Sequence, residues 1–210
     1  MGRGVPGMAF GAEVLKDLPP EPLEAVAPRV RDGDILLCAA HDPFSRLIGW
    51  STKSPWSHVA IAFRWPALDR LLVFECVQRI GVRAVAIERF ISETSEGTHP
   101  YPGKIILARH ADAPGVRAFK PLADYAVDCM GDRFSPAEIA KIALRIVVGR
   151  LDRRMPKMLV ARDEFICSEY VAKCFETVGV KIQWDGLGFI APADFAFDPK
   201  VRAVAQIETR

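Results

Sequence analysis

Three residues of this 210-residue chain have the types that nucleophilic catalysis needs, and the first of them is Cys167. It stands in the segment 165–170, where a helix is expected to begin, and it lies off the apolar stripe of that helix. Free amide N–H groups and the helix macrodipole favour the thiolate at such a position, and the thiolate is the reactive form of cysteine. By position alone, a nucleophile and a small residue filling a helix start are equally good interpretations of Cys167.

The second residue is His58, which follows the turn-like segment 53–55 and opens a predicted strand. Catalytic side chains are often presented at the ends of rigid elements. A neutral imidazole can accept a thiol proton and later protonate a leaving group. A lone histidine in such a place is more often a structural residue, so His58 is a candidate base only in company with the others.

The third residue is Glu75, a carboxylate inside the apolar run 71–77. A buried carboxylate is costly to desolvate unless it is paired or hydrogen-bonded. A histidine on a neighbouring strand is one natural partner, and Glu75 would then orient the imidazole and stabilise the imidazolium. Pairing with Arg79 or Arg83 at a sheet edge is an equally good alternative.

Taken together, these residues match the nucleophile, base and orienting acid of a cysteine hydrolase. The combination of Cys167, His58 and Glu75 is more specific than any one of the three. We expect the backbone N–H of Cys167 to lie near the oxyanion of a tetrahedral intermediate. Ser57 and Tyr170 are guesses for a second donor.

The first half of the chain reads as the sheet that must position His58 and Glu75. Its apolar runs have strand length and are rich in Val, Ile, Leu and Phe, with Gly, Pro or charged turns between them. They cover residues 35–39, 58–63, 71–77, 82–87 and 105–108. Short spacings suit antiparallel neighbours, so we expect one curved, barrel-like antiparallel sheet of about five strands.

The second half reads as helices. Apolar residues recur at helical spacing over 116–130, with Pro121 marking a break or a late start. The segment 135–138 combines an N-cap serine, a first-turn proline and a capping-box glutamate. A further helix is expected over 167–178, ended by Gly179. Strands followed by helices predict an α+β fold with the helices packed on one face of the sheet.

Composition narrows the function classes. The net charge of +2 and the scattered Lys and Arg residues exclude the basic stripe of a nucleic-acid binder. No apolar run is long enough for a membrane span, and no signal-peptide core is evident, so we expect a cytoplasmic protein. Five cysteines without a CxxC pair and four scattered histidines predict neither a metal site nor a cofactor.

The motifs in these segments resemble those of one family. The segments 31–36 and 51–61 resemble the "GDI…S…SHVGI" opening of the circularly permuted NlpC-type hydrolases, papain-like proteins often labelled YiiX/YebB-like. The segments 130–134, 165–170 and 192–195 are similar to that family's "G-x-x-Y/F", "Y-x-C-S-E" and "P-x-D" elements. The histidine precedes the cysteine in this chain, which is the permuted order.

The resemblance spans roughly residues 31–198 and implies a papain-like fold with the cysteine helix packed against the sheet. It implies Cys167 as nucleophile, His58 as base and Glu75 as the orienting residue. Phe165 replaces a tyrosine that is frequent in the family, which removes a hydroxyl from the expected substrate pocket. Residues 1–30 are expected to be an N-terminal arm or lead-in helix before a catalytic domain over 31–210.

Two functions follow as hypotheses. The first is thiol-dependent hydrolysis or acyl transfer at an amide or ester bond, on a small peptide, a cell-wall fragment or a lipid-acyl substrate. The second is a non-catalytic papain-like groove that binds an acyl or peptide ligand. A complete Cys, His and Glu set weighs against the second, because a binding module does not need all three. The sequence leaves the oligomeric state open.

Overall fold

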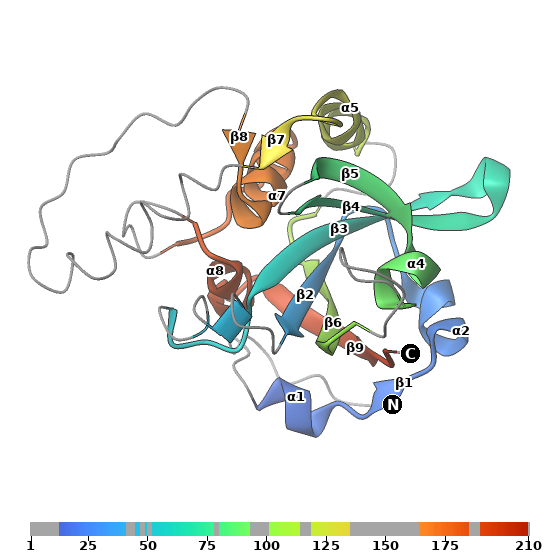
Figure 1. Ribbon diagram of the computed structural model, residues 1–210, viewed down its shortest axis with the longest axis vertical. Helices are drawn as coiled ribbons and strands as arrows, with labels where there is room; N and C mark the ends of the chain where they lie inside the picture. The colour runs from blue at the N-terminus through green and yellow to red at the C-terminus, as the bar shows by residue number, and fades with distance from the viewer. Residues whose placement is uncertain are drawn as a thin grey trace, which may run out of the picture.

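The computed structural model describes residues 13–40, 45–46, 49, 52–77, 80–92, 101–113, 119–134, 164–184 and 190–209, with the backbone alone at 134, 164 and 165 (Figure 1). Within this part of the chain, strands and helices combine in a mixed α+β fold, as the sequence predicts. The helix expected from 135 onward lies outside the described residues.

The centre of the fold is an open seven-stranded sheet in the order β1-β9-β6-β2-β3-β4-β5 (Figure 1). Its strands are β1 (Pro20–Glu21), β2 (Asp34–Ala40), β3 (His58–Trp65), β4 (Arg70–Val77), β5 (Gly81–Ala86), β6 (Gly103–His110) and β9 (Val201–Ile207). The β1–β9 pair is parallel, and the other neighbouring pairs are antiparallel. The prediction of a barrel-like sheet of about five strands is therefore wrong in strand number and in closure.

The five predicted strands all form, and the two missed ones lie together at one edge. Four of the five run beyond the predicted apolar segments, and the last strand of the chain, β9, pairs with β6. β9 carries buried apolar residues at Val201, Ala205 and Ile207, a signal that the prediction did not use. β1 has only two residues, which is too short for a hydrophobic pattern to identify.

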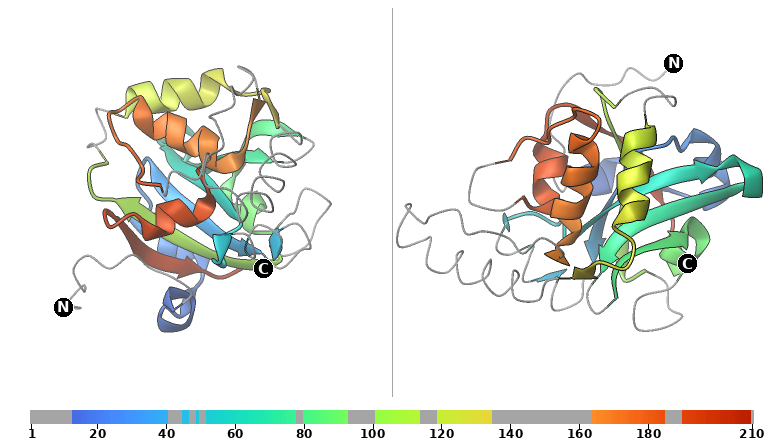
Figure 2. Two further views of the ribbon diagram at one scale, coloured as in Figure 1. Left: turned by 90° about the vertical axis from the view of Figure 1, so that its left-hand side faces the viewer. Right: turned by 90° about the horizontal axis from the view of Figure 1, so that it is seen from above.

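The helices are short and cover both faces of the sheet. They are α1 (Val14–Asp17), α2 (Leu23–Val26), α4 (Ile87–Ser92), α5 (Lys120–Asp128), α7 (Cys167–Glu176) and α8 (Pro192–Phe197), with 3-10 turns at Ala27–Arg29 (η1) and Pro66–Leu68 (η2). Figure 2 shows α5 and α7 side by side across one face. A separate parallel pair, β7 (Arg133–Phe134) with β8 (Glu164–Phe165), leads into α7.

Strand alternation divides the core into two layers. In β2, Ile35 and Leu37 pack with α5, α7 and α8, whereas Leu36 and Cys38 pack with α2 and α4 on the opposite face. Both layers are apolar and close to fully buried. The prediction that helices cover only one face is therefore wrong. It missed α2 and α4 because these helices are too short to show a helical apolar period in the sequence.

The helix that carries Cys167 forms where it was predicted. α7 begins at Cys167 and buries Tyr170, Val171, Cys174 and Phe175 against the sheet and α5. It is followed by Gly179, whose φ of +78° is a left-handed conformation that glycine adopts without strain. Pro121 stands in the first turn of α5, so the late start inferred from that proline is also observed.

Residues 13–30 pack against the same sheet. β1 pairs with β9, and Val26 and Val30 are buried in the layer under α2. The Lys104 Nζ donates to the Leu15 carbonyl oxygen at 3.0 Å, which holds α1 to β6. No helix among the described residues is long and apolar enough to cross a membrane.

Two aspartates of the motif segments have structural roles. Asp34 is 1% exposed and accepts from Arg109 at both carboxylate oxygens, at 2.6 and 2.7 Å, which ties β2 to β6. Asp194 accepts the Ala191 N–H at 2.7 Å and so caps the start of α8. These motif residues therefore position elements of the fold rather than reacting groups.

Candidate active site

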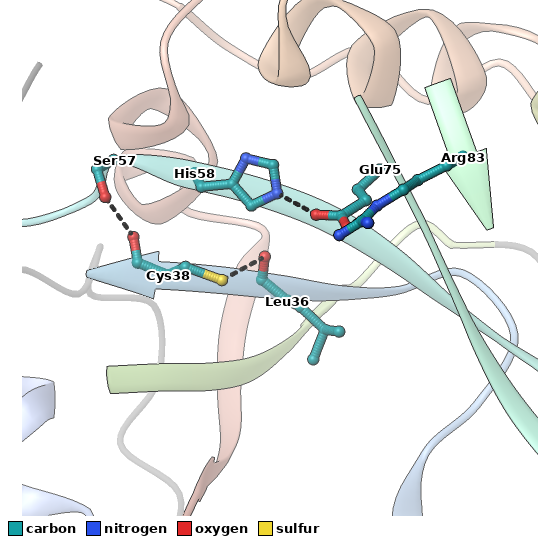
Figure 3. Close-up of polar contacts among 6 residues, drawn as sticks. All are labelled: Leu36, Cys38, Ser57, His58, Glu75 and Arg83. Atoms are coloured by element: carbon teal, nitrogen blue, oxygen red, sulfur yellow. Dashed lines mark hydrogen bonds and ion pairs between the residues drawn. The ribbon is translucent and has the colours of Figure 1, made fainter. Parts of the chain in front are cut away.

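His58 and Glu75 lie on neighbouring antiparallel strands, on the face of the sheet that α4 covers. His58 begins β3, and Glu75 stands near the end of β4, where the two strands bring their side chains together (Figure 3). The His58 Nε2 is 2.8 Å from Glu75 Oε2. The side chains are 16% and 3% exposed, so this contact is largely shielded from water. The structure thus brings together the predicted base and its predicted orienting residue.

Arg83 occupies the second oxygen of the same carboxylate. Glu75 and Arg83 are direct partners in the β4–β5 register, and Glu75 Oε1 accepts from Arg83 Nε at 2.8 Å and lies 2.7 Å from Arg83 Nη2 (Figure 3). Two of the partners that the sequence left open for Glu75, His58 and Arg83, therefore contact it, one at each oxygen, although β4 is not an edge strand. Arg79 lies outside the described residues. Burial alone would raise the pKa of Glu75, but its contacts with His58 and Arg83 lower it below the ordinary value.

Cys167 is the first residue of α7 and is 9% exposed. The preceding Ile166 has extended dihedral angles and makes no side-chain cap, so the first amides of the helix are available to other acceptors. The Cys167 sulfur accepts hydrogen bonds from the backbone N–H groups of Ser168 and Val59. It is thus held between the start of α7 and the start of β3.

The helix start itself is anchored. Ser168 is 1% exposed, and its hydroxyl donates to the Ile190 carbonyl oxygen at 2.7 Å, just before α8. One residue therefore offers its amide to the Cys167 sulfur and its hydroxyl to the neighbouring segment. This arrangement limits the freedom of Cys167 to move away from β3.

The third predicted residue completes the group, because Cys167 and His58 share a hydrogen bond. Burial is the largest single influence on both groups and opposes charge, but the other contacts together outweigh it. The interaction with His58 and two backbone amides lowers the pKa of the Cys167 thiol, and the interactions with Cys167 and Glu75 raise the pKa of His58 to about 10. Since Glu75 occupies Nε2, the Nδ1 of His58 is left to face the sulfur. Both shifts favour a thiolate–imidazolium pair.

Cys167 differs in this respect from the other four cysteines. All five are free and buried. Burial raises the pKa of Cys38, Cys76, Cys129 and Cys174, so each of them is held as a thiol. Only Cys167 among the five has a lowered pKa, because it is adjacent to His58 and to two backbone amide donors. Its surroundings therefore favour the thiolate more than those of the other four cysteines.

Aromatic rings border the imidazole on the α4 side. The ring centroids of His58 and Phe90 are 6.5 Å apart, and Phe90 stacks on Tyr101 at 5.9 Å. Phe90 and Tyr101 were not predicted, and no local pattern could have found them, since they come from α4 and from the segment just before β6.

The hydroxyl groups suggested as second oxyanion donors are engaged elsewhere. The Ser57 hydroxyl lies 3.4 Å from the Cys38 carbonyl oxygen (Figure 3), and it accepts the Ala40 N–H at 3.1 Å. The Tyr170 hydroxyl donates to the Ala126 carbonyl oxygen at 3.0 Å, in the layer between α7 and α5. Phe165 contributes its backbone to β8, and its side chain lies outside the described part of the structure.

A group of three or more His, Cys, Asp or Glu side chains arranged to hold a metal ion is not found among the described residues. The polar groups at Cys167 are instead paired with one another, through His58, Glu75 and Arg83. The arrangement can do nucleophilic and proton-transfer chemistry with these side chains.

The fold and this group of residues define a class: an open α+β sheet that carries a histidine and a glutamate on adjacent strands, beside a cysteine at a helix start. No protein-family model matches the chain, and no curated protein matches it significantly. A solved structure with a similar fold is that of the metalloprotein YiiX from Escherichia coli O157:H7, described as a DUF1105 protein. The TM-score is 0.60 and the identity 18%, over 83% of this chain and 96% of YiiX. A likeness at this identity shows the fold alone.

Proposed function

We propose that this protein is a papain-like cysteine hydrolase or acyltransferase of the circularly permuted NlpC type, with Cys167 as nucleophile, His58 as general base and acid, and Glu75 as the orienting carboxylate. The observation that carries the proposal is the imidazole of His58, which bonds to Glu75 through Nε2 and to Cys167 on its other side. The motif order in the sequence and the fold likeness to YiiX support the same assignment.

The first half-reaction uses the ion pair as it stands. The Cys167 thiolate attacks the carbonyl carbon of an amide or ester, and the carbonyl electron pair moves to oxygen. The backbone N–H of Cys167 is the candidate donor to that oxyanion, since the first amides of a helix have no partner within it. As the tetrahedral intermediate collapses, His58 gives its Nδ1 proton to the leaving amine or alkoxide, and a thioester at Cys167 remains.

The second half-reaction restores the pair. Neutral His58 accepts a proton from water, or from the nucleophile of an acceptor molecule, as that nucleophile attacks the thioester carbonyl. The carbon–sulfur bond breaks, the acyl group leaves as an acid or as the transferred product, and Cys167 again bears the thiolate. Glu75 keeps its negative charge throughout and stabilises the imidazolium whenever it forms.

The proposed substrates are small peptides, cell-wall fragments or lipid-acyl compounds, each with an amide or ester carbonyl. The thiolate–imidazolium pair suits both bond types, because the proton that an amine leaving group needs is already on His58. Water and an acceptor molecule compete for the same thioester. Hydrolysis and acyl transfer therefore share all steps up to that intermediate.

The experiment that tests the proposal is the pH dependence of Cys167 alkylation by iodoacetamide, followed by mass spectrometry. We expect Cys167 to react well below the pH of about 8.5 at which a free thiol ionises, and the other cysteines to react slowly. His58→Ala should remove this low-pH reactivity. If Cys167 reacts no faster than an ordinary thiol in both proteins, the activated nucleophile is refuted, and the groove that binds a ligand without turnover becomes the better hypothesis.

A second measurement asks for the covalent intermediate directly. After exposure to p-nitrophenyl acetate, the mass of the peptide that contains Cys167 should increase by one acetyl group, and nitrophenolate should be released in a burst. Cys167→Ser should show neither the burst nor the modification. Addition of a primary amine separates the two outcomes of the thioester, because an acyltransferase yields the acetamide while a hydrolase yields acetate.

A further inference from the structure

We propose that Arg83 is a positioning residue of this site: it keeps the Glu75 carboxylate ionised and in one orientation, so that Glu75 can hold His58 toward Cys167. The inference rests on the proposed function, since it concerns the same reacting groups. It extends the triad to a fourth residue that does not touch the thiol.

The geometry divides the carboxylate between two partners. Glu75 Oε2 faces His58 Nε2 at 2.8 Å, and Oε1 faces Arg83, with Nε at 2.8 Å and Nη2 at 2.7 Å (Figure 3). A carboxylate with one partner can rotate and exchange its two oxygens. With a guanidinium on one oxygen, rotation would break two contacts at once. Arg83 therefore fixes the plane of the carboxylate so that one of its two equivalent oxygens points at His58.

The charges also balance only with Arg83 included. The Cys167 thiolate and the Glu75 carboxylate are two negative charges, and the His58 imidazolium supplies only one positive charge. Glu75 has a side chain that is 3% exposed, where an uncompensated charge would be costly. The Arg83 guanidinium makes the group of four neutral. Without it, Glu75 would tend to take up a proton, or the thiolate would be disfavoured.

The backbone around Arg83 explains how it is held. The preceding Val82 donates its N–H to the Asp132 carbonyl oxygen at 2.9 Å and accepts from the Gly131 N–H at 3.0 Å. Arg133 then opens β7, which pairs in parallel with β8, directly before Cys167. The strand that carries Arg83, β5, is therefore hydrogen-bonded to the segment that continues into β7. Since β7 pairs with β8, which precedes Cys167, the same backbone network positions both Arg83 and Cys167.

The role differs from that of an ordinary surface ion pair. Exposed pairs on this protein, such as Arg70 with Glu88 at 3.8 Å and side-chain exposures of 60% and 53%, contribute little because water screens them. The Arg83 side chain is 23% exposed, and its partner is almost completely buried. Arg70 stands on the same strand as Glu75, five residues away, or about 16 Å along an extended chain. It is therefore a matched control for the loss of one arginine.

The experiment measures the range of pH over which Cys167 is rapidly alkylated, in the parent and in Arg83→Gln, Arg83→Lys and Arg70→Gln. We expect Arg83→Gln to raise the acid edge of this range by about one pH unit, a tenfold loss of rate below the edge, because loss of the Arg83 charge disfavours the thiolate. Arg83→Lys should give an intermediate range, since it keeps the charge and loses the guanidinium plane, and Arg70→Gln should match the parent.

A double-mutant cycle excludes a merely structural effect. If Arg83 acts through Glu75, Arg83→Gln should change the alkylation range little when Glu75→Gln is already present. The double variant has no Glu75 carboxylate to be left without its Arg83 partner, so it can be assayed even if Arg83→Gln alone folds poorly. A parent-like range in both Arg83 variants, or an equal effect of Arg83→Gln with and without Glu75, overturns the inference. A parent whose Cys167 lacks low-pH reactivity overturns the proposed function instead.

Discussion

His58 and Glu75 are joined across two antiparallel strands by a contact of 2.8 Å between Nε2 and Oε2, and this contact leaves only Nδ1 of the imidazole for another partner. In the proposed mechanism, Nδ1 is therefore the nitrogen that exchanges a proton with Cys167. The ring cannot turn over without losing its bond to Glu75. The contact with Glu75 therefore fixes the orientation of the His58 ring.

The coupling of the thiol to the imidazole can be observed on His58 itself. The charge and hydrogen bond of Cys167 are the main causes that raise the pKa of His58 to about 10, against the effect of burial. Cys167→Ser removes the thiolate, so we expect the pKa of His58 to fall well below 10 in this variant. NMR titration of the histidine ring signals measures it. An unchanged pKa would show that the thiolate is not the partner.

Loss of the orienting acid should cost less activity than loss of the base. Once a substrate is identified, His58→Ala should reduce turnover by about 100- to 10,000-fold, the usual contribution of a general acid–base group. Glu75→Gln should cause a smaller loss, because a glutamine can still accept from Nε2 but does not stabilise the imidazolium. Steady-state turnover of the three proteins provides the comparison, and a Glu75→Gln variant as active as the parent would contradict the role of Glu75.

The interaction of His58 with Cys167 should make the unfolding free energy depend on pH. The pKa of His58 rises from 6.5 to about 10 on folding, so its contribution is complete below pH 6.5 and is lost as the pH rises through about 10. The pKa of Cys167 is lowered from 9.0, so its contribution is complete above pH 9.0 and is lost as the pH falls. The His58 contribution therefore falls with rising pH while the Cys167 contribution grows, so the two trends oppose each other until Cys167 reaches its full contribution at pH 9.0.

Chemical denaturation at a series of pH values tests this directly. The difference in unfolding free energy between the parent and Cys167→Ser should shrink as the pH rises from 9.0 through about 10, where His58 loses its proton, and should shrink toward acid as Cys167 takes up a proton. Glu75 adds a further loss toward acid in both proteins, since its pKa is lowered and its contribution disappears as the pH falls below its ordinary 4.5. A difference that stays constant with pH would contradict the ion pair.

Gly81 should be intolerant of a side chain. It has a φ of +87°, and a Cβ there would overlap the carbonyl oxygen of Asp132, which also accepts the Val82 N–H. Gly179 has a similar φ of +78° but open space where a Cβ would lie, so Gly179→Ala reports the conformational cost alone, about 1–2 kcal/mol. Gly81→Ala should lose more unfolding free energy than this control. Equal losses would mean that the contact with Asp132 is unimportant.

The Tyr170 hydroxyl should affect stability rather than chemistry. It donates to the Ala126 carbonyl oxygen at 3.0 Å and so joins α7 to α5. Tyr170→Phe removes this buried bond, and we expect a loss of about 1 kcal/mol in unfolding free energy with the low-pH alkylation of Cys167 retained. Thermal unfolding and the alkylation assay measure the two quantities separately. Loss of Cys167 reactivity in a folded Tyr170→Phe variant would restore the hydroxyl as a member of the site.

Local patterns in the sequence were sufficient for much of the scaffold. Five strands and the helix that begins at Cys167 were predicted, because apolar runs of strand length and a helical stripe ended by Gly179 are properties of short segments. The edge strand β1 was not predictable in this way, since its two residues form a strand only by pairing with β9, far along the chain. The helices α2 and α4 on the second face were missed because they are too short to show a helical apolar period.

The sequence by itself determined which side chains could react and placed Cys167 at a helix start, His58 at a strand start and Glu75 within an apolar strand. Only the tertiary structure decided their partners. The β4–β5 register sets Arg83 opposite Glu75, and the β3–β4 pairing sets His58 beside it. Strand register is a property of two paired strands, and the ionisation of a side chain depends on its burial and on neighbouring charges. Neither can therefore be assigned from the segment that contains the residue alone.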